Sequence, residues 1–360
     1  MLWITLAIVF ISGYFARRYN GNVAAIDGVI LTSNRPNKGL AFIAAAALVL
    51  VSGLRNNIGD TGYYIYGFVH SIPYKGEPGF DVFQSLIKEL ISNDPQVFIF
   101  ICALITNALI VLVFYKYSAM FELSLFLYIT TGNYLVTMNG IRQCLVSAIV
   151  FLGTQLIATG KWLPFFILVG LVSTIHTSAL IFIPVYFFVR LKPWSKLISI
   201  TLIAAIVVLL LFDQIGAFLL GTFDGTQYAG YEKSILAAGG GANILRVFVG
   251  AVPVILAYLG RKQIEKNNDK FVNILINFSV LNLTFYVLAV QNWIFARMNV
   301  YFGLYGLLLL PWLIKKLFDK KTSAIVYGSC VLLYIIFCYF ELESYLSYWG
   351  IGYRSDFIGL

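Results

Sequence analysis

Apolar runs separated by short polar segments cover nearly the whole chain. A helix needs about 20 mostly apolar residues to cross the hydrocarbon core of a membrane, and twelve runs approach that length. They lie at residues 1–16, 39–54, 95–115, 119–137, 141–159, 162–175, 178–190, 197–213, 245–260, 271–290, 298–314 and 323–340. The sixth and seventh are short, so a broken or re-entrant element is an alternative there. The pattern predicts an all-α, polytopic integral membrane protein with about 12 transmembrane helices, forming a single transmembrane domain over residues 1–360.

Two longer polar segments interrupt this pattern. Residues 55–94 carry apolar side chains at helical spacing, which predicts an amphipathic helix lying in the membrane interface. These side chains are Phe83, Leu86, Ile87, Leu90 and Ile91. Asp94 and Pro95 are typical of the N-cap and first turn of the next helix. The second segment, residues 214–244, is a loop rich in Gly and Tyr.

The composition excludes most other classes of protein. Apolar residues make up 60% of the 360 residues and charged residues only 11%, against about 25% charged in soluble proteins. A soluble enzyme, a secreted disulfide scaffold, a nucleic-acid binder and a disordered chain are therefore all excluded. The four cysteines lie in apolar runs without metal-ligand spacing, and we expect no metal and no cofactor.

The positive charges predict an orientation in the membrane. Arg17 and Arg18 follow the first apolar run instead of preceding it, the reverse of a cleavable signal peptide. If the N-terminus lies outside, 17 of the 25 Lys and Arg residues fall on the cytoplasmic side and 8 on the outer side. This is the bias expected of a correctly oriented chain. Twelve spans would then place both termini outside the cytoplasmic membrane.

Four arginines gather at the predicted outer ends of the helices. They are Arg55, Arg142, Arg246 and Arg297. A charged group inside a helical bundle costs about 2.5–3.5 kcal/mol even on the lenient insertion scale, so such groups usually face a polar cavity or a partner. Because few acidic residues lie near them in sequence, an anionic ligand is favoured, and guanidinium groups bind phosphate oxygens bidentately.

Each of these positions also has a purely structural interpretation. Arg55 and Asp60 are close enough in sequence to form an ion pair, and Arg142 could reach the membrane interface along its own stem. His176 could be a hydrogen-bonded residue at a helix end. The outer-side tyrosines could stack on sugar rings, or belong to the aromatic belt of any membrane protein.

Several motifs give the chain a resemblance to a known family. Gly53-Leu54-Arg55 followed by Gly59-Asp60-Thr61 and Tyr64 resembles the Arg…Gly-Thr-Asp…Tyr signature of the EpsG-like family of Wzy-type bacterial polysaccharide polymerases, with Asp60 and Thr61 in swapped order. Further matching stretches follow in order along the chain, and the resemblance as a whole covers about residues 1–310. They are Glu77-Pro78-Gly79-Phe80, Asn139-Gly140-Ile141-Arg142-Gln143, His176-Thr177-Ser178-Ala179-Leu180, and Arg297 before Tyr301.

The resemblance implies a metal-independent glycosyltransferase of the bacterial cytoplasmic membrane. It would join oligosaccharide repeat units linked to undecaprenyl diphosphate at the outer leaflet, with one such lipid as donor and another as acceptor. Its partners would be these two lipids and the bilayer. A chain-length regulator is a further candidate partner, and no nucleic acid is expected.

The expected site combines these motifs with the charged residues. We expect the diphosphate at Arg142, Arg297 and Arg55, with Arg246 a weaker candidate. His176 is the first choice for the catalytic base and Asp60 the second, although Asp60 could instead orient Arg55. The candidate substrate-binding residues are Tyr64, Asn139, Gln143 and Tyr228.

Two other functions remain open at this point. A flippase for lipid-linked oligosaccharides would also place cationic groups on a diphosphate, but deep in the membrane and often between repeated halves. An O-antigen-ligase-like transferase would share the donor chemistry and use a different acceptor.

Overall fold

A computed structural model describes residues 1–19, 21–22, 34–211, 241–267, 269–349, 352–357 and 359. Helices dominate these parts, and a two-residue antiparallel pair, β1 (Gly21–Asn22) with β2 (Asn34–Arg35), lies between the first two helices. The α-helices are α1 (Leu2–Arg18), α2 (Lys38–Gly53), α3 (Thr61–Val69), α4 (Pro78–Leu90), α5 (Pro95–Tyr117), α6 (Phe121–Thr130), α7 (Asn133–Asn139), α8 (Ile141–Leu152), α9 (Thr154–Ala158), α10 (Trp162–Ser173), α11 (Phe182–Val189), α12 (Lys196–Leu210), α15 (Ile244–Leu259), α16 (Arg261–Asn267), α17 (Lys270–Ala289), α18 (Trp293–Leu317) and α19 (Lys320–Trp349). A 3₁₀ helix, η1 (Thr177–Ile181), precedes α11.

The all-helical, multi-pass character predicted from the sequence is confirmed, whereas the number of spans is not. Within the described ranges, four helices are long and apolar enough to cross a membrane, and a fifth span results if α15 and α16, bent by 69°, count as one. The four are α5, α17, α18 and residues Lys320–Glu343 of α19. Other predicted runs are divided. The fourth run breaks between α6 and α7 at Gly132, whose φ of 80° no helix accommodates.

Contacts within the chain divide it into two compact units. One unit holds residues 1–187 and 310–360, and the other holds residues 188–309.

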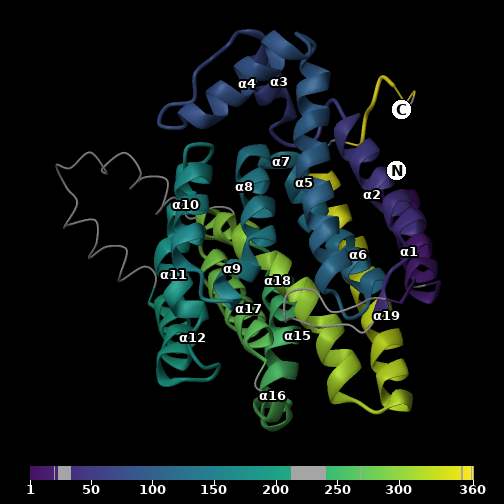
Figure 1. Ribbon diagram of the computed structural model, residues 1–360, viewed down its shortest axis with the longest axis vertical. Coiled ribbons are helices and arrows are strands. Elements are labelled where there is room, and N and C mark those ends of the chain that lie inside the picture. The colour runs from purple at the N-terminus through teal and green to yellow at the C-terminus, as the bar shows by residue number, and fades with distance from the viewer. Residues whose placement is uncertain are drawn as a thin grey trace, which may run out of the picture. The chain divides into compact units, whose positions relative to one another are not determined.

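In the first unit, α3 and α4 lie across the ends of α5, α8 and α10 (Figure 1). An aromatic core joins them. It consists of Tyr64, Phe68, Tyr74, Phe80, Ile87, Phe98, Ile99, Cys102 and Ile141, all buried. As the capping pattern predicted, Asp94 caps α5 through a 2.8 Å bond from the backbone N–H of Gln96, and Pro95 starts the helix. This core fixes α3, α4 and the segment between them.

The predicted apolar face of α4 is divided between protein and surroundings. Ile87 is buried in the aromatic core together with Phe80, whereas Leu86 and Leu90 are 47% and 75% exposed. One side of the helix therefore packs against its own unit and a second apolar side faces outward. An outward apolar side is what a helix at a membrane interface requires, although its place in the membrane stays a prediction.

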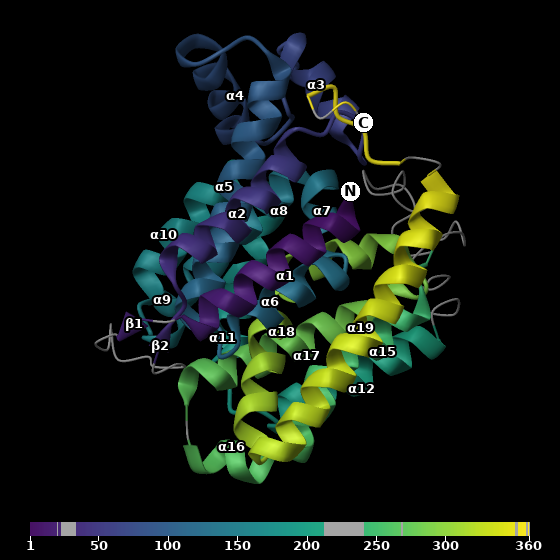
Figure 2. The same ribbon diagram turned by 90° about the vertical axis from the view of Figure 1, so that its right-hand side faces the viewer.

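The C-terminal tail is tied to the loop that follows α2. The backbone N–H of Asn56 donates to the carbonyl oxygen of Arg354 (3.1 Å), and that of Arg354 donates to Oδ1 of Asn57 (2.9 Å). The Tyr353 hydroxyl donates to the carbonyl oxygen of Val51 (3.0 Å). The tail and this loop therefore lie together, as the yellow segment in Figure 2 shows.

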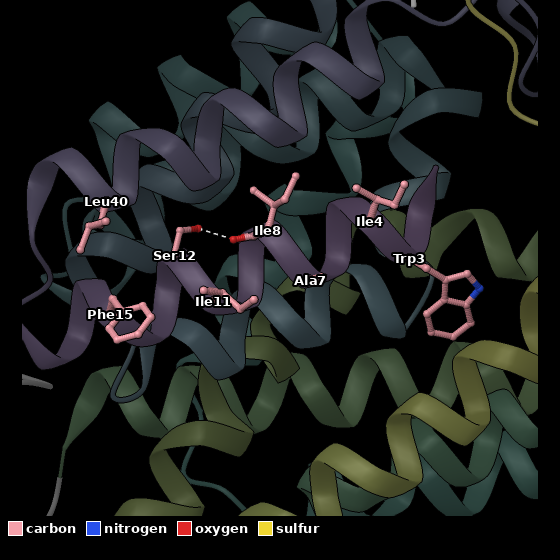
Figure 3. A pocket seen from close by; sticks show the side chains of 8 residues that line it. All are labelled: Trp3, Ile4, Ala7, Ile8, Ile11, Ser12, Phe15 and Leu40. Carbon is pink, nitrogen blue, oxygen red and sulfur yellow. Dashed lines mark hydrogen bonds between the residues drawn. The ribbon is translucent and has the colours of Figure 1, made fainter.

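An open groove runs along the exposed face of α1 (Figure 3). Apolar side chains from Trp3 to Phe15, with Leu40 of α2, line it. Its one hydroxyl, that of Ser12, donates to the carbonyl oxygen of Ile8 on the same helix (2.6 Å). A continuous apolar face whose polar groups are satisfied internally is typical of a surface that meets lipid tails.

The second unit has a small core of its own where α12 and α15 pack against α17. Ile198, Val254 and Val280 form its centre. The Asn277 side chain donates to the carbonyl oxygens of Val189 (3.0 Å) and Leu191 (2.7 Å), which fastens the connection before α12 to α17.

Two substitutions on α4 test its division into a packed side and an outward side. Phe80→Ala removes a ring with no exposed surface and should destabilise the protein by about 3–5 kcal/mol. Leu90→Ala changes a side chain that is 75% exposed and should leave stability almost unchanged. Melting temperatures in the same detergent measure both, and equal effects would contradict the described packing.

Candidate functional site

A buried carboxylate joins two of the predicted site residues. One oxygen of Glu77, Oε2, forms an ion pair with Nη1 of Arg142, and the other, Oε1, lies 2.6 Å from Nδ1 of His176. The Glu77 side chain is 8% exposed, whereas those of Arg142 and His176 are 20% and 21% exposed. The carboxylate therefore lies beneath two groups that remain accessible. Arg142 and His176 lie 65 and 99 positions after Glu77 in the sequence.

Aromatic rings surround the guanidinium of Arg142. Its central carbon lies 4.2 Å from the centre of the Tyr74 ring and 5.8 Å from the centres of Tyr64 and Phe80. Its Nε donates to the Tyr64 hydroxyl at 3.4 Å. Such contacts attract a cation to the ring faces and restrict its orientation, so the edge of the guanidinium carries its polar contacts.

Burial raises the pKa of both phenols near Arg142, those of Tyr64 and Tyr74. Both hydroxyls therefore stay protonated at neutral and mildly alkaline pH. Tyr64 accepts a hydrogen bond from Arg142 and keeps its own O–H to donate.

The sequence around Glu77 explains how its carboxylate reaches His176. Pro78 occupies the first turn of α4, where its fixed φ suits a helix start. At Gly79 a side chain is sterically excluded, because a Cβ there would lie 2.8 Å from Cβ and 3.0 Å from the carbonyl carbon of Thr174. Its backbone N–H instead donates to the carbonyl oxygen of Thr174 (2.9 Å). The start of α4 is thereby docked on the end of α10, next to His176.

Arg55 occupies a different environment from Arg142. It is 1% exposed, and its donors are directed at the protein. Nε donates to Oγ1 of Thr61 (3.0 Å), Nη2 to the carbonyl oxygen of Met138 (2.8 Å), and Nη1 to the carbonyl oxygen of Ser52. Burial lowers the pKa of this guanidinium to about 10, so it is still a cation at neutral pH. This geometry gives the predicted diphosphate contact of Arg55 no support.

Asp60 and Asn139 meet where the loop after α2 contacts the end of α7, a contact that we call the α2–α7 junction. The backbone N–H of Asp60 donates to Oδ1 of Asn139 (2.9 Å), and the Asp60 carboxylate is exposed. Gly59 has a φ of 56°, and a Cβ there would lie 2.6 Å from Cγ of Asn139. Nε of Arg55 donates to the hydroxyl of Thr61, so Thr61 orients this guanidinium. The alternative in which Asp60 orients Arg55 is therefore not supported. Since Met138 and Asn139 end α7 just before Arg142, this junction fixes where α8 begins.

The remaining predicted residues are not all brought together. Gln143 is 8% exposed and Tyr64 4% exposed in the first unit. Arg246 and Arg297 belong to the second unit, where the Arg297 guanidinium lies 4.8 Å from the centre of the Trp293 ring. Tyr228 lies outside the described residues, as does most of the 214–244 loop. Within the described parts of the chain, no three His, Cys, Asp or Glu side chains gather where they could hold a metal ion.

Sequence reasoning missed Glu77 as a member of the site. It lay inside the quoted Glu77-Pro78-Gly79-Phe80 motif, but nothing in that motif indicates which distant residues its carboxylate meets. The usable signal was an acidic residue in the same predicted polar segment as other motif residues, in a chain where Arg142 and His176 need a counter-charge.

A family model described as the EpsG family matches residues 38–349. No curated protein and no solved structure matches the chain.

A substitution at Gly79 tests the docking of α4 on α10. In Gly79→Ala the added methyl group meets Thr174, and overpacking of this kind costs about 1–3 kcal/mol. Gly170→Ala, on α10 where a Cβ meets nothing within 4 Å, is the matched control. Thermal unfolding should show destabilisation in the first variant alone, partly reversed by adding Thr174→Ala. Equal stability of the two glycine variants would contradict the docking.

Proposed function

The chain belongs to the EpsG family, and from this premise we propose that it is a polysaccharide polymerase. In this proposal the protein is a glycosyltransferase that joins oligosaccharide repeat units linked to undecaprenyl diphosphate. The growing chain on one lipid is the donor, and a hydroxyl of the incoming lipid-linked unit is the acceptor. A multi-pass membrane protein suits such substrates because both carry long hydrocarbon tails.

The single observation that carries the proposal is the pairing of Arg142 and His176 on Glu77. Transfer of the sugar breaks the bond between the anomeric carbon and the diphosphate oxygen. It forms a bond to the acceptor oxygen, whose proton must leave. The reaction therefore needs a cation for the leaving group and a base for the proton, and the site offers both within one cluster.

Arg142 is the candidate partner of the leaving diphosphate. Negative charge accumulates on the diphosphate oxygens as the anomeric bond breaks, so a fixed cation stabilises the transition state more than the ground state. The stacking on Tyr74 holds the guanidinium in place beforehand. The Tyr64 hydroxyl, protonated and next to Arg142, is suited to donate to a phosphate oxygen.

His176 is the candidate base. An ionised Glu77 accepts the N–H of Nδ1, so the other ring nitrogen, Nε2, is the one that takes the acceptor's proton. A carboxylate that fixes the tautomer and orientation of an imidazole in this way recurs in enzymes that use histidine as a base.

The other predicted residues take supporting roles in this proposal. The α2–α7 junction, which precedes Arg142, is held by Arg55, Asn139 and the backbone of Asp60. Gln143 follows Arg142 in α8. Arg246 and Arg297 remain candidates for further diphosphate contacts, and Tyr228 for sugar binding. We place the reaction at the outer leaflet of the bacterial cytoplasmic membrane, with both termini outside. The tie between the C-terminal tail and the loop after α2 fits this orientation.

The first test of function is removal of the Arg142 guanidinium. Arg142→Ala should reduce long polymer by at least about 10²-fold, the usual cost of losing a donor to developing negative charge, with single lipid-linked repeats and protein level unchanged. Arg354→Ala, at an exposed position of the tail, is the arginine control and should polymerise normally. Surface-glycan gels of a complemented deletion strain give the measurement.

The same gels separate the alternatives. Single capped repeats in the deletion strain indicate a polymerase, accumulation on the inner side a flippase, and unattached polymer a ligase. Normal chain lengths with Arg142→Ala would refute the role of this residue.

The second test removes the proposed base. His176→Ala should slow polymerisation by about 10²–10⁴-fold, the range that a positioned base contributes. His70→Ala is the matched control, because that exposed ring lies at the end of α3, with its centre 4.1 Å from the centre of the Tyr66 ring and Nδ1 3.0 Å from the Tyr66 carbonyl oxygen. The initial rate of polymer formation in proteoliposomes measures both, and an unchanged rate with His176→Ala would exclude it as the base.

A further inference from the structure

Glu77 pairs with both Arg142 and His176, and on Arg142 it occupies a position that an anionic ligand would also use. Its two oxygens are divided, Oε2 to Arg142 and Oε1 to His176, with the backbone N–H of Thr177 also directed at Oε1 (3.4 Å). An anionic ligand that takes the Arg142 guanidinium by its edge meets a position already held by a carboxylate of the same charge. A carboxylate and a diphosphate in contact repel each other unless a cation or proton lies between them.

The surroundings of Arg142 leave this competition hard to avoid. One face of the guanidinium is covered by the Tyr74 ring at 4.2 Å, and Nε is directed at the Tyr64 hydroxyl. A bidentate contact with phosphate uses two adjacent N–H groups of the fork. The edge that includes Nη1 is therefore shared between Glu77 and such a ligand.

The backbone around Glu77 is fixed independently of Arg142. The Glu77 N–H donates to the carbonyl oxygen of Tyr74 (2.9 Å), and the Thr177 hydroxyl donates to that of Gly76 (3.1 Å). With the Gly79 bond to Thr174, these contacts persist when the side chain of Glu77 leaves Arg142. A rotation of the carboxylate is then sufficient, and His176 is the partner that it retains.

We propose that Glu77 is a positioning residue that couples binding of the diphosphate to activation of the base. Without substrate, Glu77 neutralises Arg142 and is shared with His176. The diphosphate displaces Oε2 from Arg142, and the whole carboxylate charge then acts on the Nδ1–H of His176, which makes Nε2 a stronger proton acceptor. This inference rests on the proposed function, and it explains why the accessible cation and the base share one buried acid.

A purely structural ion pair predicts something different. If Glu77 only anchors its loop, removing the charge weakens ligand binding and turnover together. The coupling predicts opposite changes, because Glu77 competes with the ligand for Arg142 but assists His176.

The experiment uses the full-length protein in detergent with geranylgeranyl diphosphate as the binding probe. Geranylgeraniol and inorganic diphosphate separate the contribution of the tail from that of the charged group. In Glu77→Gln we expect the probe to bind about tenfold more tightly while the rate of polymer formation falls by about 10²-fold or more. The neutral amide no longer holds Arg142 as a counter-ion, and it can present an N–H to Nδ1 and impose the wrong tautomer. Glu77→Asp keeps the charge and should recover part of the rate without tighter binding.

A second measurement needs no substitution at Glu77. The chain has two histidines, so ¹⁵N-histidine labelling gives two rings, and His70 serves as the internal reference. Binding of the probe to the wild-type protein should shift the Nδ1 signal of His176 and leave that of His70 unchanged.

The outcomes distinguish the inference from the function beneath it. If Arg142→Ala abolishes probe binding but Glu77→Gln binds no more tightly, or the bound probe leaves the Nδ1 signal of His176 unmoved, the coupling is wrong and the polymerase proposal stands. If neither the wild type nor any variant binds the probe, both are overturned.

Discussion

The central interaction in this protein is the contact of one buried carboxylate with an arginine of α8 and a histidine of the segment between α10 and η1. An ionised Glu77 with so little exposed surface is costly unless its charge is paired and hydrogen-bonded. Arg142 and His176 supply both partners. The same contact solves the opposite problem for Arg142, whose charge at the end of an apolar helix would otherwise be drawn toward the headgroups. The segment that carries Glu77 is thus held by charge to the start of α8 and to His176.

Burial distinguishes Arg55 from Arg142, the two arginines of the first unit that the sequence analysis places in the candidate site. Arg55 has almost no exposed surface, and its donors go to carbonyl and hydroxyl oxygens of the protein. Its hydrogen bonds connect the end of α2 to the end of α7. Arg142 is partly exposed, is stacked on Tyr74, and its counter-charge is a side chain that can rotate. Two arginines that lie near helix ends in the sequence therefore differ in environment: Arg55 makes structural contacts, whereas Arg142 keeps an accessible side for the proposed ligand.

Local sequence patterns predicted the helical character of the chain and the positions of several helices, but not the number of spans or the contacts between helices. The apolar runs located the helices, and Asp94-Pro95 located the start of α5, because capping and periodicity act over a few residues. The spans were harder to count, since Gly132 breaks an otherwise continuous apolar run through its backbone conformation. The outward apolar side of α4 was only partly predicted, because Ile87 and Leu86 differ in what packs on them and not in their hydrophobicity.

The candidate site shows the same limit. His176 and Arg142 could be selected from the sequence as groups that apolar packing does not explain. The role of Glu77 depends on partners far along the chain, and on the close approach of Gly79 to Thr174, which no local pattern encodes. The most direct test of the account is a density map of the protein in lipid nanodiscs with undecaprenyl diphosphate bound. We predict the diphosphate on the Arg142 guanidinium, with the Glu77 carboxylate on His176 alone. A diphosphate bound elsewhere, with Glu77 still paired to Arg142, would contradict the account.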